Sequence, residues 1–308
     1  MSKVKLLLAI HSHQPVGNFE GVFQEAYEKA YRPFIDIIDR HPDIKLALHY
    51  SGGLIDWLER KQPDFIEKIK DLVSRGQVEI LAGGYYEPIL PIIPEQDALG
   101  QIELLQAKIK GLFAHEAGGA WLTERVWEPR TAYILSKSGL KYTIVDDSHF
   151  KFISQDPEDL AGFYISEEQG EPLFIFPGSE KLRYLMPFRL PQETIDYLRM
   201  RLARAGQDLA ITFADDGEKF GLWPGTHKWV YKEQWLENFL KILEQNRDWI
   251  EFISFSEYIK QNPPSGKIYL SCASYREMLE WSDGYFRNFF IRYPEADNMH
   301  KKMFYVSN

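Results

Sequence analysis

The stretch VKLLLAI at residues 4–10 runs directly into HSHQP at residues 11–15, and this junction decides the fold class. Apart from Lys5, the first part is an apolar run of the kind found in buried strands of parallel sheets. The second part carries side chains suited to binding and catalysis. Further apolar runs lie at residues 44–50, 77–83, 119–124, 142–147, 173–177, 209–216 and 251–256, and reactive residues again stand at their carboxyl ends.

Longer amphipathic stretches separate most of these runs and predict helices at residues 23–41, 64–76, 98–113 and 232–246. Pro33 is expected to kink or divide the first helix, and Gly76 to cap the second at its carboxyl end. Strands that alternate with helices indicate βαβ units and a parallel sheet.

Two parallel α/β architectures place their sites after the strands. A doubly wound sheet that binds nucleotides has a glycine-rich phosphate turn after its first strand, whereas here HSHQPVGN follows it. A barrel builds its active site at the carboxyl ends of all its strands. We therefore expect an α/β fold with a parallel barrel of seven or eight strands.

The alternation of strand and helix patterns stops at QNPPSGK, residues 261–267. This stretch predicts a domain boundary, because a double proline favours neither helix nor strand. We expect residues 1–262 to form the barrel domain and residues 263–308 to form a helical appendage near the barrel mouth.

The composition excludes several classes of protein. A net charge of −9 with a pI near 5.5 argues against nucleic-acid and anionic-membrane partners. The single cysteine, Cys272, excludes an intramolecular disulfide and a four-cysteine zinc site. MSKVKLLLAI has too short an apolar run for a signal peptide, and no stretch has the length of a membrane span, so a cytoplasmic location is expected.

Aromatic residues make up 15% of the chain, including eight tryptophans. They are compatible with a generous core and equally with sugar binding, because the apolar faces of pyranose rings stack on indole and phenol rings. Composition alone leaves both interpretations open.

Two apolar runs end in clustered carboxylates. WLTERVWEP supplies Glu124 and Glu128, and ADDGEKFG supplies Asp215, Asp216 and Glu218. Cleavage of a glycosidic bond needs two carboxyl groups, one as nucleophile or base and one that protonates the leaving oxygen. A single acidic loop is usually a solvated surface feature, but two at separate strand ends favour catalysis.

His11 and His13 lie two residues apart, so an extended backbone points both side chains the same way. Together with an aspartate they leave open a metal site of the kind used by sugar deacetylases. They are equally suited to hydrogen bonding with sugar hydroxyls. Glu87 follows a double glycine, where it is either part of a turn or a ligand-binding group.

Four motifs, in this order, resemble those of glycoside hydrolase family 57: HSHQPVGN, GGYYEPIL, WLTERVWEP and FADDGEKFG. LWPGTHKWVY, KLRYLMPFR and ASYREMLEWS are similar to its 4-α-glucanotransferase and α-amylase branch. The resemblance covers nearly the whole chain. It implies a (β/α)7 barrel followed by a helical segment, and a retaining mechanism on α-1,4-glucans that needs neither a metal nor another cofactor.

The resemblance also implies residue roles. Glu124 is the expected nucleophile and Asp216 the expected acid/base. Sugar binding is expected of a larger set, which comprises His11, His13, Glu87, Trp127, Asp215, Trp223 and Trp281. By contrast, Glu128 is expected to be structural and Trp121 to lie in the core.

The favoured activity is therefore that of a 4-α-glucanotransferase on maltooligosaccharides or starch, with a hydrolytic α-amylase as the alternative. From other classes, a metal-dependent sugar deacetylase and a non-catalytic glucan-binding module remain open. Members of this branch continue well beyond the equivalent of residue 308, so the chain is either part of a longer protein or a compact member. The sequence is compatible with a homodimer.

Overall fold

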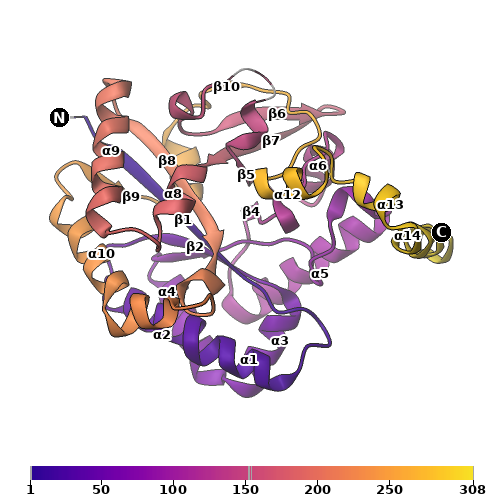
Figure 1. Cartoon of the computed structure of the whole chain (residues 1–308), viewed down its shortest axis with the longest axis horizontal. Coiled ribbons are helices and arrows are strands. Elements are labelled where there is room, and N and C mark those ends of the chain that lie inside the picture. The colour runs from indigo at the N-terminus through magenta and orange to yellow at the C-terminus, as the bar shows by residue number, and fades with distance from the viewer. Residues whose placement is uncertain (1, 152, 154, 308) are drawn as a thin grey trace.

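A closed ring of parallel strands organises the chain (Figure 1). The computed structural model describes residues 2–151, 153 and 155–307. Within these residues the ring has seven members: β1 (Val4–Ser12), β2 (Leu46–Tyr50), β3 (Val78–Ile80), β4 (Gly119–Ala120), β5 (Tyr142–Asp146), β7 (Glu171–Gly178) and β8 (Leu209–Asp216). Neighbouring strands pair in parallel, and a bridge between Ala82 and Ala120 joins β3 to β4. The expected (β/α)7-type barrel is thus confirmed.

The period of two along β1 sorts its side chains between the two sides of the barrel wall. Leu7 and Ala9 belong to a cluster that fills the barrel interior, together with Ala47 of β2 and Ala214 of β8. Leu6, Leu8 and Ile10 belong to the larger cluster under the helices. Burial on both sides explains why the strand is apolar without a break from Leu6 to Ile10.

Three short strands lie outside the ring. β6 (Tyr164–Glu168) forms an antiparallel hairpin with β7, and β10 (Gly266–Lys267) adds to β6. The hairpin turn places Gln169 and Gly170 at φ 55° and 83°, the positive values that two-residue hairpin turns require. β9 (Ile250–Phe252) pairs with the first residues of β1, below the point where β2 joins it.

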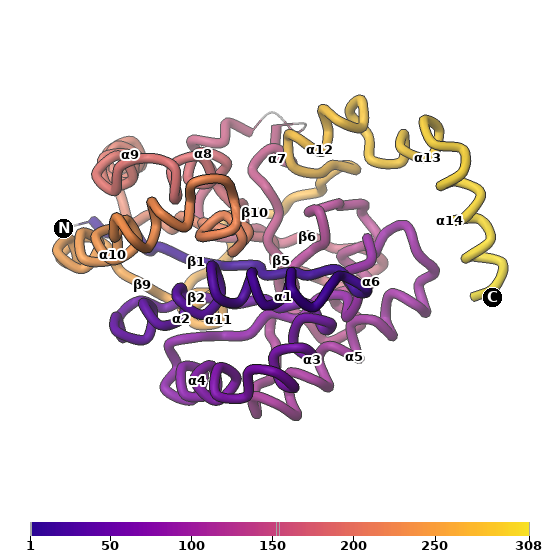
Figure 2. The backbone as a smooth tube through the Cα atoms, turned by 60° about the horizontal axis from the view of Figure 1, so that its bottom comes forward, coloured from indigo at the N-terminus to yellow at the C-terminus, as the bar shows by residue number. Residues whose placement is uncertain are grey.

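Helices cover the outside of the ring (Figure 2). The helix expected at residues 23–41 is divided, because a π-helical turn at Tyr27–Tyr31 separates α1 (Glu20–Ala26) from α2 (Arg32–Asp39), the helix that contains Pro33. Gly76 follows α4 with φ 72°, as its capping role requires. The others are α3 (Gly52–Lys61), α4 (Pro63–Ser74), α5 (Glu95–Phe113), α6 (Arg130–Lys137), α7 (Ser148–Lys151), α8 (Glu180–Leu185), α9 (Pro191–Ala205), α10 (Trp235–Gln245) and α11 (Phe255–Gln261).

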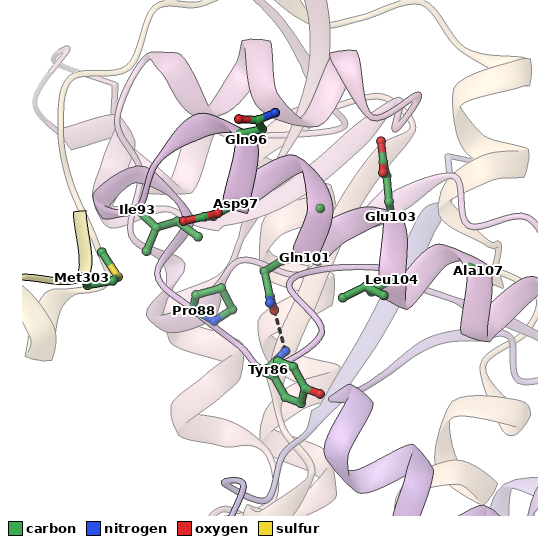
Figure 3. Close-up of a pocket in the computed structure, with 11 residues that line it drawn as sticks. Tyr86, Pro88, Ile93, Gln96, Asp97, Gln101, Glu103, Leu104, Ala107 and Met303 are labelled. Carbon is green, nitrogen blue, oxygen red and sulfur yellow. Dashed lines mark hydrogen bonds between the residues drawn. The ribbon is translucent and has the colours of Figure 1, made fainter. Parts of the chain in front are cut away.

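The C-terminal residues form α12 (Arg276–Trp281), α13 (Asn288–Arg292) and α14 (Pro294–Ser307). In Figure 1 these yellow helices run outward from α12 toward the edge of the molecule. Nε2 of His300 on α14 contacts the carbonyl of Ile92, just before α5. Between α5, the loop at residues 86–88 and α14 lies a groove (Figure 3). The division at residue 262 stays a prediction.

Among the described helices, none is both long enough and apolar enough to cross a membrane.

Candidate active site

A pocket of about 740 Å³ opens at the carboxyl ends of the barrel strands. Seven of the residues expected at the site line it: His11, His13, Glu87, Glu124, Asp216, Trp223 and Trp281. Their convergence follows from the strand register. His11 of β1 lies directly opposite His49 of β2 and Asp216 of β8, and all three continue the face that points into the barrel. The inward period of the strands therefore places His11 and Asp216 in the lining of the pocket, with His49 buried against His11.

Glu124 stands on a tight turn, Thr123–Arg125, that follows β4. Glu124 and Arg125 have φ values of 53° and 46°, in the left-handed region that residues with side chains rarely adopt. Tertiary hydrogen bonds hold this backbone. Ser274 Oγ donates to the carbonyl of Glu124 at 2.6 Å, and Nε2 of His149 lies 2.9 Å from the carbonyl of Arg125. Such local strain is characteristic of functional sites.

The side chain of Glu124 is also held. The hydroxyl of Tyr275 donates a hydrogen bond of 2.7 Å to Glu124 Oε2. The ring of Tyr275 lies beside the guanidinium groups of Arg125 and Arg183, each 5.4 Å from its centroid. Burial, followed by the charge of Glu124, raises the pKa of Tyr275, so its hydroxyl keeps the proton that it donates.

Asp216 ends β8, and a 3-10 turn, Gly217–Phe220, follows at once. Glycine at position 217 lets the turn pack closely against β1, because a Cβ there would lie 2.7 Å from Ser12 Oγ and 3.1 Å from Ile10 Cγ2. The turn brings Glu218 into the pocket wall, where it accepts hydrogen bonds from the Tyr31 hydroxyl and from the backbone N–H of His13. Burial raises the pKa of Glu218 to about 7, and the charge of Asp216 adds to this effect.

Three histidines surround the carboxyl group of Glu87. Nε2 of His11 and Nδ1 of His13 lie 3.5 and 3.4 Å from its Oε2, and Nδ1 of His49 lies 3.4 Å from its Oε1. Burial lowers the pKa of each histidine, most strongly for His11 and His49. Burial, with the charges of Glu218, Asp216 and Glu124, holds the pKa of Glu87 well above its usual value.

The contact between His11 and His49 assigns their tautomers. The two Nδ1 atoms are 2.8 Å apart, so one donates a proton to the other. Nε2 of His49 is buried and has no hydrogen-bond partner among the described residues, so a proton there would be an unpaired donor. The proton of His49 therefore sits on Nδ1, and His11 accepts it. The proton of His11 is then on Nε2, which faces Glu87 and the pocket.

His11, His49 and Glu87 lie close enough together to hold a metal ion. The tautomers explain the arrangement without one, because the lone pair on Nδ1 of His11 already accepts the proton of His49. Asp146, Asp147 and Glu180 form a second acidic group. Oxygens of this group already contact Arg183, Arg276 and the backbone N–H of Glu180.

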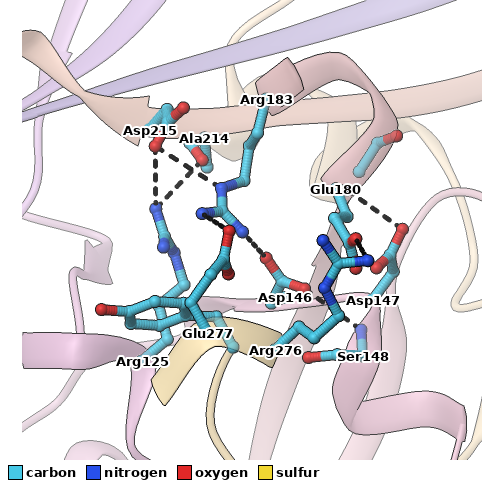
Figure 4. A network of polar contacts seen from close by, with 12 residues as sticks. Arg125, Asp146, Asp147, Ser148, Glu180, Arg183, Ala214, Asp215, Arg276 and Glu277 are labelled. Atoms are coloured by element: carbon cyan, nitrogen blue, oxygen red, sulfur yellow. Dashed lines mark hydrogen bonds and ion pairs between the residues drawn. The ribbon is translucent and has the colours of Figure 1, made fainter. Parts of the chain in front are cut away.

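A buried ionic network underlies the pocket (Figure 4). Asp215 Oδ2 accepts from Lys219 Nζ at 2.6 Å, and its Oδ1 lies 3.5 Å from both Arg125 and Arg183. Arg183 also pairs with Asp146 at 2.6 Å. These contacts fix Arg125, the neighbour of Glu124, in the wall of the pocket, and they hold Asp215, the neighbour of Asp216, buried behind that wall.

The sequence matches glycosyl hydrolase family 57 over residues 4–271, and the alpha-amylase/4-alpha-glucanotransferase middle domain over residues 284–308. The chain belongs to glycosyl hydrolase family 57. It is 43% identical to alpha-amylase 1 of Dictyoglomus thermophilum, with 97% of this chain and 48% of that protein aligned. It is 41% identical to 4-alpha-glucanotransferase of Thermococcus litoralis, with 100% of this chain and 51% of the relative aligned.

The crystal structure of the Thermococcus litoralis 4-alpha-glucanotransferase superposes with a TM-score of 0.94. The superposition covers 100% of this chain and 52% of that structure, at 40% identity. The chain thus spans about half the length of the relatives that it matches. Membership of family 57 agrees with the resemblance that the four motifs indicated.

For two residues of this family 57 chain, the structure contradicts the expected position in the sugar-binding site. Trp127 is 1% exposed and does not line the pocket, because a bridge to Ala273 covers it and its indole N–H donates to the carbonyl of Leu270. Asp215 is fully buried, with its oxygens held by Lys219 and the two arginines. Its odd position on β8 places it on the face of Ile211 and Phe213, away from the barrel interior.

Trp121 is buried as expected, but it also lines the pocket, where its ring stacks on His11 with centroids 4.6 Å apart. Glu128 agrees with its expected structural role. Its carboxylate forms a two-pronged ion pair with Arg287, which precedes α13.

Three residues around the site were not expected there from the sequence: Tyr275, Glu218 and His49. Glu218 and His49 could have been predicted from the sequence. Each lies in a motif at the end of an apolar run, two residues after a position whose side chain faces the barrel interior. Tyr275 lies in the C-terminal segment, and its local sequence gives no sign that it reaches Glu124, 151 residues away.

Proposed function

We propose that this chain carries the catalytic site of a retaining α-1,4-glucan enzyme that acts on maltooligosaccharides or starch as a 4-α-glucanotransferase. The observation that carries the proposal is the meeting of Glu124 and Asp216 in one pocket, each at a strand end. Family membership and the names of relatives that are 43% and 41% identical support it.

In the first step, a carboxylate oxygen of Glu124 attacks the anomeric carbon of a glucose unit. The glycosidic bond breaks, and Asp216, which begins protonated, gives its proton to the departing oxygen. A glucosyl ester on Glu124 is left. The hydrogen bond from Tyr275 leaves one oxygen of Glu124 available for attack and orients it.

In the second step, Asp216 removes the proton from an acceptor hydroxyl, whose oxygen attacks the ester carbon and frees Glu124. A 4-hydroxyl of another glucan as acceptor gives transfer, and water gives hydrolysis. A double displacement restores the original configuration at the anomeric carbon.

The remaining residues are assigned to sugar binding. The Nε2–H of His11 and the carboxyl of Glu87 face the position of the reacting glucose and suit its hydroxyls, with His13 beside them. Trp223 and Trp281 are 45% and 57% exposed on the pocket wall, so each offers indole surface on which a sugar ring can stack.

Incubation with maltotriose tests the activity. A ladder of longer oligosaccharides, resolved by chromatography, identifies a transferase. Glucose and maltose as sole products identify an α-amylase. Binding without turnover would leave a glucan-binding module, and activity that EDTA removes and zinc restores would indicate a metal-dependent hydrolase.

Substitution tests the residue roles. Glu124→Ala and Asp216→Ala are each expected to abolish turnover of maltooligosaccharides. Glu128→Gln is the matched control, because it alters a glutamate in the same motif that pairs with Arg287 outside the chemistry. Near wild-type turnover in either alanine variant would refute the assignment.

A further inference from the structure

The groove on the outer face of α5 has about the same volume as the catalytic pocket, about 730 Å³. Its walls come from α5, from the loop at residues 86–88 and from Met303 of α14 (Figure 3). Two large apolar side chains are open to solvent in it. Tyr86 is 57% exposed and Leu104 is 52% exposed, although most apolar groups of their size in this chain are buried.

The groove and the catalytic pocket share one wall. Along the loop, Tyr86 and Pro88 line the groove, whereas Glu87 and Ile89 line the pocket. The left-handed backbone of Glu87, with φ 55°, turns its side chain to the opposite side from Tyr86. A chain that leaves the pocket over this loop therefore enters the groove directly.

The shared wall is held against α5. The backbone N–H of Tyr86 donates to Gln101 Oε1 at 2.9 Å, and that of Tyr85 donates to the carbonyl of Gln101 at 3.1 Å. Because both bonds use backbone donors, they hold the loop in place whatever side chain stands at position 86. Tyr86 is thus a ring presented on a fixed support.

The chemistry of the lining selects a neutral, hydroxyl-rich ligand. Asp97 and Glu103 supply carboxylates, and Gln96 and Gln101 supply amides, beside the exposed faces of Tyr86 and Leu104. Among the described lining residues there is no lysine, arginine or histidine. This lining disfavours phosphates and other anions. Apolar faces next to hydrogen-bonding side chains suit pyranose rings.

We propose that the groove binds the arm of an α-glucan chain that extends from the catalytic pocket across residues 86–89. The inference rests on the proposed function, because it concerns the same glucan substrate at a second binding site, the groove beside α5. It assigns to Tyr86 a role in binding long chains, with no part in the bond-breaking step.

The test compares a long and a short substrate. For Tyr86→Ala, the ratio of KM for short-chain amylose to KM for maltotriose is expected to rise between about twofold and tenfold, the range that one lost ring contact represents. Leu104→Ala on α5 is expected to change the ratio in the same direction, which tests the groove without altering the loop beside Glu87. The ratio isolates the extended chain, since maltotriose reports on the pocket alone.

Tyr269→Ala is the matched control, because Tyr269 has nearly the same exposure, 56%, and lines neither cavity. The control is expected to leave both KM values unchanged. An unaltered ratio in both groove variants, with maltotriose still turned over, overturns the groove and leaves the proposed function standing. A change in oligomeric state by light scattering, without a change in the ratio, identifies the groove as a contact between copies and also overturns it.

If the wild-type protein turns over no glucan, the proposed function fails, and the groove must be tested by binding. Equilibrium titration with maltoheptaose measures this binding. The groove then stands only if Tyr86→Ala weakens maltoheptaose binding relative to Tyr269→Ala. Equal affinities of the two variants overturn it.

Discussion

The hydroxyl of Tyr275 donates a hydrogen bond of 2.7 Å to Oε2 of Glu124, across 151 residues of sequence. The adjacent Ser274 binds the carbonyl of Glu124, and the preceding Ala273 pairs with Trp127 in both directions. Three consecutive residues of the C-terminal segment therefore hold the turn that carries the expected nucleophile. The barrel alone does not complete this site.

Tyr275→Phe tests how much the side-chain hydrogen bond contributes. The variant keeps the ring between Arg125 and Arg183 and removes only the donor. A hydrogen bond to a charged group contributes about 1.5–3 kcal/mol, so kcat on maltotriose is expected to fall about tenfold to hundredfold, with a smaller change in KM. Steady-state kinetics measures both constants.

The control for this substitution is Tyr133→Phe on α6, a tyrosine outside the pocket. Its kinetics are expected to match those of the wild type. If Tyr275→Phe also matches the wild type, the hydroxyl does not position Glu124. If KM alone rises, Tyr275 binds substrate and does not orient the nucleophile.

His49 is expected to act through His11, because its Nδ1 proton directs the Nε2 proton of His11 into the pocket. In His49→Asn the amide occupies roughly the place of Nδ1, whereas in His49→Gln it reaches the place of Nε2. We expect kcat/KM to fall about fivefold in the Gln variant, which corresponds to one neutral hydrogen bond of about 1 kcal/mol, and to fall less in the Asn variant. Equal losses in both variants would assign His49 to packing alone.

The local sequence predicts the barrel because each ring strand carries its own signal. Each of the eight apolar runs contains a strand in the described structure. β6, with the sequence YISEE, escaped prediction because it is half exposed and acidic, and its hairpin partner stabilises it as a strand. A local sequence pattern reveals a strand only where the side chains of that strand are buried, and four of the five residues of β6 are only partly buried.

The candidate site divides in the same way. The family resemblance separated Asp216 from Asp215, and the register gives the physical reason, since alternate residues of β8 face opposite sides of the barrel wall. Trp127 was misplaced because its loop position indicated exposure, while Ala273 covers it from a distant part of the chain. Tyr275 was missed for the same reason. Contacts between segments far apart in sequence leave no local pattern.

Asp147 gives the fold a pH dependence. Burial, with the neighbouring charge of Asp146, raises the pKa of Asp147 to about 8, whereas in an unfolded chain an aspartate has a pKa near 3.9. Between these values the folded chain holds a proton that the unfolded chain has lost. The contribution of Asp147 to stability is therefore complete below about pH 4 and is lost as the pH rises to about 8, with a slope of up to about 1.4 kcal/mol per pH unit.

Asp147→Asn removes this titration. Its melting temperature is expected to exceed that of the wild type at pH 8 and to approach it near pH 4, as calorimetry at several pH values can measure. Asp248→Asn makes the same substitution at an exposed aspartate and is expected to follow the wild type. A constant difference between Asp147→Asn and the wild type at every pH would show that Asp147 does not titrate in this range.

The buried pair of Asp215 and Lys219 couples the stability of the chain to the site. Lys219→Met removes the cation 2.6 Å from a fully buried carboxylate. Breaking such a pair costs about 3–5 kcal/mol, and the low end is expected, because Arg125 and Arg183 still face the other oxygen of Asp215. Urea unfolding measures the loss. Burial raises the pKa of Asp215 and the charge of Lys219 opposes this effect, so without Lys219 the loss of stability should grow as the pH rises.

The double variant Asp215→Asn/Lys219→Met, compared with the two single variants in a double-mutant cycle, measures the interaction between the two side chains. Removal of both charges leaves no uncompensated carboxylate, so its free energy of unfolding is expected to lie closer to that of the wild type than that of Lys219→Met does. Additive losses would mean that the two side chains act independently. Recovery of stability without recovery of turnover would place the role of the pair in the alignment of Asp216, the next residue along β8, because the fold would then be intact while the proposed acid/base remained displaced.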